Sequence, residues 1–104
     1  NKNVKYGDIH KEREREYSTY SFEIADVDML FVIFDKFEKE AEKILEKELI
    51  YPAYDYILKL SHIFNLLDSR KAISVSERVR YIQRVRKLAN KCATLYIEKG
   101  KGII

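Results

Sequence analysis

The sequence contains few of the residues that interrupt helices or cross-link a chain. Its 104 residues include three glycines, one proline, one cysteine and no tryptophan. A single cysteine, Cys92, excludes a framework of internal disulfides. The scarcity of glycine argues against the glycine-rich loops that hold phosphates in nucleotide-binding proteins. Few turn-forming residues favour long helices with short connections, so the sequence predicts an all-α fold.

Long apolar runs are also missing. The longest run, Met29–Phe34, is far shorter than the ~20 residues that a membrane-spanning helix needs. The first residues are polar and basic, with no apolar stretch behind them, so we expect no signal peptide and no contact with a membrane. The unpaired cysteine fits a reducing, cytoplasmic setting. Because the chain does not begin with methionine, we expect a fragment or a processed product.

The composition that remains is globular, with an uneven distribution of charge. Hydrophobic residues make up 46% of the chain, which is too much for a disordered protein. Residues 1–68 hold 10 Lys and Arg against 15 Asp and Glu, a net charge of −5, whereas residues 69–104 hold 10 against 2, a net charge of +8. Two interpretations stay open: the two halves face each other within the fold, or the basic half binds an acidic partner such as nucleic acid or another subunit.

Apolar residues spaced three and four apart predict three principal helices, over about residues 27–48, 53–66 and 75–98. Asp26 is expected to cap the first of them. The only proline, Pro52, fits the start of the second. Ser74 and Glu77 have the spacing of a capping box at the start of the third. We therefore expect a small bundle of three helices.

A further helix is predicted in front of the bundle, over about residues 8–20, where charged residues are dense. We expect Tyr17, Tyr20 and Phe22 to anchor its end on the core. At the other end of the chain, Gly100 and Gly102 are expected to terminate the last helix. The apolar stripe expected on that last helix comprises Val79, Ile82, Val85, Ala89, Cys92 and Tyr96.

Residue patterns of catalytic or metal chemistry are absent from the sequence. His10 and His62 are far apart and have no cysteine partner at zinc-ligand spacing. Cys92 lies among apolar residues and is interpreted as a small hydrophobic side chain. We therefore predict that this chain contains no catalytic, cofactor-binding or metal-binding residues.

A set of basic residues at helical spacing lies on one side of the last predicted helix. They follow steps of four, three and four, and we call them the basic face: Arg80, Arg84, Lys87 and Lys91. We expect all four to face the solvent. They either keep the helix soluble, or bind phosphates or the acidic surface of a subunit.

The most specific signal is a run of sequence over residues 61–78, which reads SHIFNLLDSRKAISVSER. It closely resembles the run S-H-x-F-N-L-L-D-A-R-x-A-I-S-V-T-E-R near the C-terminus of the α subunit of bacterial-type glycyl-tRNA synthetase. Flanking matches include Tyr6-Gly7-Asp8 and Pro52-Ala53-Tyr54-Asp55. The resemblance covers about residues 6–96. Departures are small, such as Lys71 where the family commonly has glycine.

This resemblance implies a specific biological context. The family is a class II aminoacyl-tRNA synthetase built as an α2β2 tetramer. Its α subunit makes glycyl-adenylate from glycine and ATP with Mg²⁺, and its β subunit carries most of the tRNA recognition. The resemblance implies that residues 1–104 form a single helical domain, the C-terminal part of that α subunit, with the class II catalytic core upstream and absent.

In that context the chain supports assembly and activity of a ligase that attaches glycine to tRNA(Gly). Its implied partners are its own catalytic core, the second α subunit, the β subunits and tRNA(Gly). ATP and Mg²⁺ would belong to the parent enzyme, and we expect the isolated chain to be inactive in aminoacylation. The alternative is a free-standing helical module that binds protein or nucleic acid.

Polar residues of the signature run gather where one predicted helix ends and the next begins. We call them the polar corner: Asn65, Asp68, Arg70, Ser74, Glu77 and Arg78. Asn65 is expected to bind free carbonyls at the helix end, and Asp68 to pair with Arg70 or Arg78 or to cap the turn. The polar corner either locks two helices together or serves as a docking site for the β subunit or the tRNA.

Overall fold

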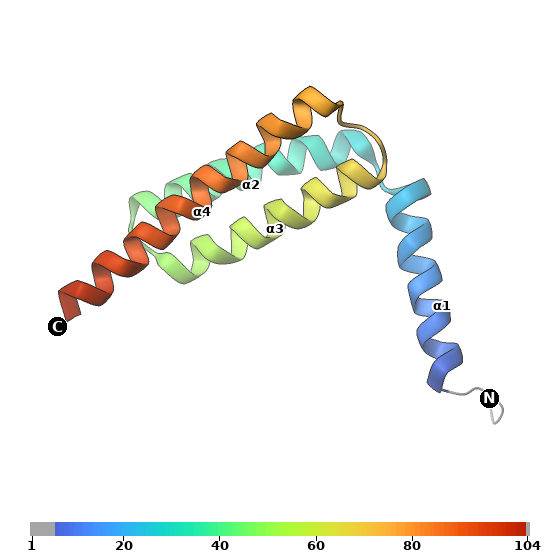
Figure 1. Cartoon of the computed structure of the whole chain (residues 1–104), viewed down its shortest axis with the longest axis horizontal. Helices are drawn as coiled ribbons and strands as arrows, with labels where there is room; N and C mark the ends of the chain where they lie inside the picture. Colours follow the sequence, from blue (N-terminus) through green and yellow to red (C-terminus); the bar gives the residue numbers. More distant parts are fainter. Residues whose placement is uncertain (1–5, 104) are drawn as a thin grey trace.

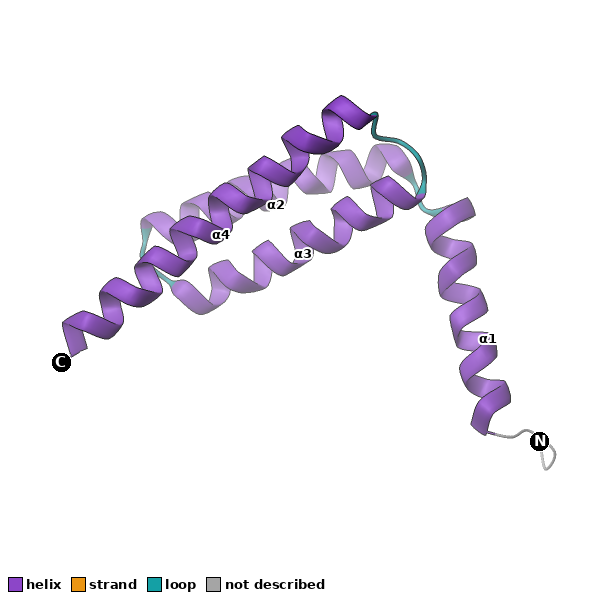
Figure 2. Cartoon of the chain, viewed as in Figure 1, coloured by secondary structure: helices purple, strands orange, loops and turns teal. Residues whose placement is uncertain are grey.

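The structure is a computed structural model that describes residues 6–103, and the side chains of residues 7–100. Helix α1 (Tyr6–Thr19) continues into a short π-helix, η1 (Tyr20–Ile24). The bundle follows as α2 (Val27–Glu46), α3 (Ile50–Ser69) and α4 (Val75–Ile103). No strand occurs within the described range (Figure 2). The predicted all-α fold, with three bundle helices and one helix in front, is confirmed.

Helices α2 and α3 form an antiparallel hairpin, and α4 lies along it, packing mainly on α3 (Figure 1). The buried core runs between the three helices. It contains Leu30, Phe34, Ala41, Ile44 and Leu45 of α2, Ala53, Ile57, Leu60, Ile63, Leu66 and Leu67 of α3, and Leu88 and Cys92 of α4. Among the described side chains of α4 only two are buried, so this helix covers the hairpin rather than entering it.

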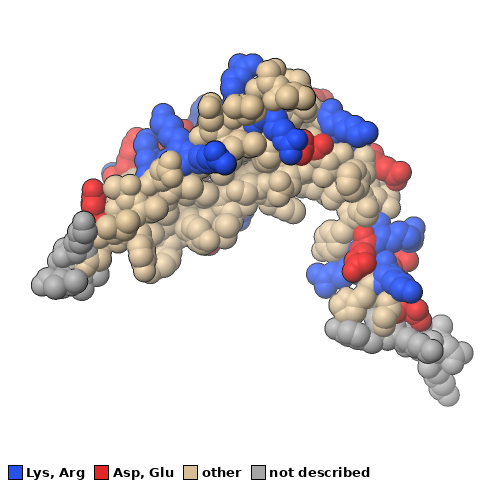
Figure 3. All heavy atoms as spheres, in the orientation of Figure 1, with Lys and Arg blue, Asp and Glu red and all other residues tan. Residues whose placement is uncertain are grey.

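Helix α1 extends away from the bundle and gives the molecule the outline of an arch (Figures 1 and 3). Among the described elements it packs only on η1, which in turn packs on α3. The Cα radius of gyration is 17.8 Å, against about 13 Å for a compact chain of this length. Both the projecting α1 and the 29-residue α4, which extends past the hairpin in Figure 1, contribute to this long outline.

The expectation that Tyr17, Tyr20 and Phe22 anchor this segment on the core is wrong, because all three side chains are exposed. The anchor is instead Ala25, which is only 1% exposed. The backbone at Ala25 and Asp26 is extended (ψ 131° and 109°). This change of direction carries α1 off the core, so its aromatic residues do not reach it, and the ring of Tyr17 contacts Arg13 of the same helix instead.

The predicted caps of α2 and α4 are present. The Oδ1 atom of Asp26 accepts a hydrogen bond from the Met29 backbone N–H at 2.9 Å. At the start of α4 the Glu77 N–H donates to Ser74 Oγ at 3.2 Å, and the Ser74 N–H donates to Glu77 Oε1 at 3.3 Å. Both caps satisfy backbone donors that the first helical turn leaves free.

Two helix boundaries differ from the prediction. Helix α3 begins at Ile50, with Pro52 in its first turn, and continues to Ser69. Helix α4 continues through Gly100 to Ile103, so the expectation that Gly100 and Gly102 terminate it is wrong. A glycine ends a helix when it adopts positive φ, and no described glycine does so.

The helix ends at the two bundle turns use left-handed residues that are not glycine. Glu48, after α2, and Lys71, after α3, both have φ 57°. In each turn two backbone amides bond back to the helix, for example Ala72 N–H to Leu67 O and Lys71 N–H to Asp68 O, both at 3.0 Å. This is the Schellman arrangement, which usually places glycine at the left-handed position. A side chain there costs about 1–2 kcal/mol.

We expect Lys71→Gly to stabilise the fold by about 1 kcal/mol, because the relief of left-handed strain exceeds the extra entropy that glycine gains on unfolding. The free energy of unfolding in urea measures the change. Lys71→Ala is the matched control, since it removes the charge but keeps the β-carbon, and it should give no gain. Equal effects of the two variants would show that the strain is not the cause.

Candidate functional site

The basic face of α4 is the first candidate site, and it does not behave as one surface. Arg80, Lys87 and Lys91 are exposed, and basic side chains gather over α4 in the space-filling view (Figure 3). The fourth residue, Arg84, is different, because its side chain is only 32% exposed. It turns toward α2.

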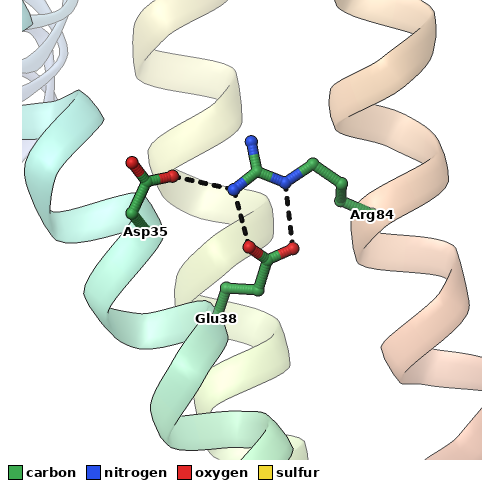
Figure 4. A network of polar contacts seen from close by, with 3 residues as sticks. All are labelled: Asp35, Glu38 and Arg84. Carbon is green, nitrogen blue, oxygen red and sulfur yellow. Dashed lines mark hydrogen bonds and ion pairs between the residues drawn. The ribbon is translucent and has the colours of Figure 1, made fainter.

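Arg84 binds two carboxylates of α2 (Figure 4). Its Nε and Nη2 donate to the two carboxylate oxygens of Glu38 at 2.9 and 2.6 Å. The same Nη2 donates to Asp35 Oδ1 at 2.7 Å. Glu38 is 20% exposed and Asp35 60%. A two-point contact between a guanidinium and a carboxylate fixes both partners more firmly than a single charge pair.

The Arg84 guanidinium also lies against two aromatic rings. Its central carbon is 4.7 Å from the ring centroid of Phe34 and 4.8 Å from that of Tyr81. The two rings meet edge to face, with centroids 4.8 Å apart. The hydrogen bonds to Glu38 raise the pKa of Arg84 above its ordinary value, and partial burial opposes them. Arg84 is therefore charged at every accessible pH.

The expectation that all four basic residues face the solvent is thus wrong for Arg84. The reason is that α4 passes over α2 where Asp35 and Glu38, one helical turn apart, flank the buried ring of Phe34. The sequence shows these acids on α2 and the arginine on α4. It does not show where the two helices cross, so no pattern of neighbouring residues predicts that Arg84 binds these two acids.

The exposed members of the basic face also have acidic neighbours. Arg80 lies in a shallow hollow with Glu77, and Lys91 lines another with Glu42 and Glu46 of α2. The acidic half and the basic half of the chain therefore face each other along part of the α2–α4 contact. Lys87 does not line either of these two hollows.

The polar corner is the second candidate site, and its residues form separate contacts. Arg78 pairs with Asp68 at 3.2 Å, which leaves Arg70 to other partners. The guanidinium of Arg70 donates instead to the backbone carbonyls of Ala25 and Phe22, both at 3.0 Å. The polar corner thus joins three parts of the chain, namely the end of η1, the end of α3 and the start of α4.

The remaining members of the polar corner cap helices or face the solvent. Ser74 and Glu77 form the cap of α4, and hydrogen bonds from Ser74 hold the pKa of the Glu77 carboxyl below its ordinary value. Asn65 is exposed. The carbonyls that Asn65 was expected to bind accept hydrogen bonds from the backbone amides of Arg70, Lys71 and Ala72 instead, because the Schellman turn closes the end of α3.

No described residues form a metal or nucleophile site. Nowhere between Tyr6 and Ile103 do three His, Cys, Asp or Glu residues gather as metal ligands. Cys92 is buried, and burial raises the pKa of its thiol, which makes it a poor nucleophile at neutral pH. Within the same range no helix is long and apolar enough to cross a membrane.

An apolar groove between α3 and α4 was not predicted from the sequence. It has a volume of about 380 Å³ and is lined by Ile50, Tyr51, Tyr54 and Ile57 of α3 and by Ala89, Cys92, Ala93, Tyr96 and Ile97 of α4. Tyr96 was expected on the buried stripe of α4, but it is exposed, as is Val79. The only hint in the sequence is that α3 and α4 carry more apolar positions than one buried stripe requires.

Comparison with known proteins decides the family. The family described as "Glycyl-tRNA synthetase alpha subunit" matches residues 1–101. The chain is also 52% identical over 102 residues to the protein "Glycine--tRNA ligase alpha subunit" of Petrotoga mobilis (strain DSM 10674 / SJ95). The chain belongs to the glycyl-tRNA synthetase alpha subunit family. The resemblance seen in residues 61–78 is confirmed, and the match covers 98% of this chain but 36% of that relative.

In this family member, Arg84→Glu should destabilise the fold by roughly 2 kcal/mol, between the values for exposed and buried ion pairs. The substitution places a third carboxylate beside Asp35 and Glu38 and removes the cation from the rings of Phe34 and Tyr81. Urea unfolding measures the loss. The matched control is Lys87→Glu, one turn along the same helix, which should change stability by less than about 0.5 kcal/mol. Equal losses would contradict the inward role of Arg84.

Proposed function

We propose that this chain is the helical part of the α subunit of a glycine–tRNA ligase, and that it supports assembly and activity of that enzyme in the cytoplasm. The observation that carries the proposal is the family match over residues 1–101. The chain spans 36% of the Petrotoga relative, which leaves ample length in such a subunit for a catalytic core. A free-standing binding module is not favoured by this match.

We place the chemistry of the enzyme outside these residues. Formation of glycyl-adenylate needs sites for ATP, glycine and Mg²⁺, and the described residues offer no cluster of acidic or histidine ligands for a metal. The role that we assign to this chain is to bind and to position. We propose that it acts as one domain within an α2β2 assembly with its catalytic core, the second α subunit and the β subunits.

We further propose that the outward part of the basic face, namely Arg80, Lys87 and Lys91, contacts an acidic partner in the enzyme. All three are exposed, whereas Arg84 is held by Asp35 and Glu38. The partner is the phosphate backbone of tRNA(Gly) or an acidic surface of another subunit. Contacts of either kind weaken as salt rises, because counterions compete with the lysines and arginines.

The role of the polar corner remains part of the proposal. Its contacts between Asp68 and Arg78, and from Arg70 to the backbone of η1, support a lock between helices rather than a docking site. Each of these cations already has a partner within the chain. Arg84, which is held by Asp35 and Glu38, is not part of the proposed contact surface for the same reason.

The triple variant Arg80→Glu, Lys87→Glu and Lys91→Glu, made in the complete enzyme, should weaken tRNA charging or α–β association about tenfold or more at low salt. It should also flatten the salt dependence of the affected step. Glycylation rates and subunit association are measured across a salt titration. Loss of charging with normal association identifies tRNA as the partner, and loss of association identifies a subunit.

The matched control reverses three exposed lysines, namely Lys36 and Lys39 of α2 and Lys47, the C-cap of that helix. It changes the net charge by the same amount but leaves α4 intact, so charging and association should stay close to those of the unmodified enzyme. Identical curves for the basic-face variant, the control and the unmodified enzyme would show that the basic face is only a solvated surface.

A further inference from the structure

The joint between helix α1 and the bundle is built from very few contacts. Helix α1 packs on η1, and among the described helices of the bundle η1 packs on α3 alone. None of the bundle helices covers α1, and the side chains of Tyr17 in α1 and Phe22 in η1 are exposed. The direction of α1 in the arch (Figure 1) is therefore not set by a hydrophobic interface along its length.

Arg70 bridges this joint. It is the C-cap of α3, and it reaches back to residues that lie more than forty positions earlier in the chain. Its Nε donates to Ala25 O at 3.0 Å, and its Nη1 donates to Phe22 O at 3.0 Å. Ala25, whose carbonyl is one of the two acceptors, is the buried C-cap of η1. One guanidinium therefore holds two carbonyls at the end of the segment that carries α1.

The chemistry of these acceptors suits an arginine. The last carbonyls of a helix lack intrahelical partners, and they carry the negative end of the helix dipole. A guanidinium presents several donors in one rigid plane, so it can hold two such oxygens at a fixed separation. The backbone of Arg70 is itself held in place by the Schellman turn. The Arg70 N–H donates to Leu66 O, and the Lys71 N–H donates to Asp68 O.

We propose that Arg70 is a positioning residue that sets the direction of α1 relative to the three-helix bundle. The closed turn at the end of α3 fixes the backbone of Arg70, and its side chain transmits that position to η1 and on to α1. A partner that contacts both α1 and the bundle then binds two surfaces whose spacing is already fixed. This lowers the conformational entropy that the chain loses on binding.

A distance measurement between α1 and the bundle tests this proposal. Spin labels are placed on exposed positions through Glu14→Cys in α1 and Gln83→Cys in α4, in the whole chain with Cys92→Ala. Pulsed electron resonance should give one narrow distance distribution for the chain with Arg70. Arg70→Ala should roughly double its width, since α1 loses its tether while the bundle stays folded. Arg70→Lys keeps the charge but loses the planar set of donors, and the width of its distance distribution should lie between those of the other two chains.

Two controls separate positioning from general stability. Arg78 is the other arginine of the polar corner, and it joins two helices by pairing with Asp68. Arg78→Ala should leave the distance distribution between α1 and α4 narrow. A second label pair within the bundle, Lys36→Cys with Gln83→Cys, should be unchanged in every variant. Should Arg70→Ala fail to fold, Arg70→Lys decides on its own. An unbroadened distribution in the folded Arg70 variants, or a broad one before any substitution, would overturn the proposal.

Discussion

The bundle depends on the place where α4 crosses α2 over the side chain of Phe34. This ring is fully buried, Tyr81 meets it edge on, and Arg84 lies over both rings while it binds Glu38 and Asp35. One contact therefore combines apolar burial, aromatic packing and a two-point ion pair. Together with the packing of Leu88 and Cys92, the buried residues among the described side chains of α4, this contact holds α4 against the α2–α3 hairpin.

This arrangement divides the positive charge of the molecule into two roles. Arg84, Arg78 and Arg70 each have partners within the chain and hold elements together. Arg80, Lys87 and Lys91 remain exposed on α4 and are available to a negatively charged partner. Membership of the glycyl-tRNA synthetase alpha subunit family gives such a partner a context. The helical fold thus offers a rigid support with a basic side, to which α1 is joined by a narrow link.

The features that could be predicted from the sequence are those that depend on residues close to one another along the chain. The three-four spacing located the bundle helices, and Asp26 and Ser74 were recognisable as caps because a cap binds residues only a few positions away. The inward turn of Arg84 and the exposure of Tyr17 were not predictable, because they depend on where helices cross and where the chain changes direction. The prediction at Gly100 was wrong because a glycine ends a helix only where it adopts positive φ, and Gly100 does not.

The importance of the α2–α4 crossing is tested most directly by the free energy of unfolding of Phe34→Ala in urea. A fully buried phenylalanine at the meeting point of Tyr81 and Arg84 should cost roughly 3–5 kcal/mol when truncated, a large part of the stability of a domain this size. Val32→Ala, at an exposed position of the same helix, provides the reference and should change little. A loss below about 1 kcal/mol for Phe34→Ala would show that the bundle does not depend on this contact.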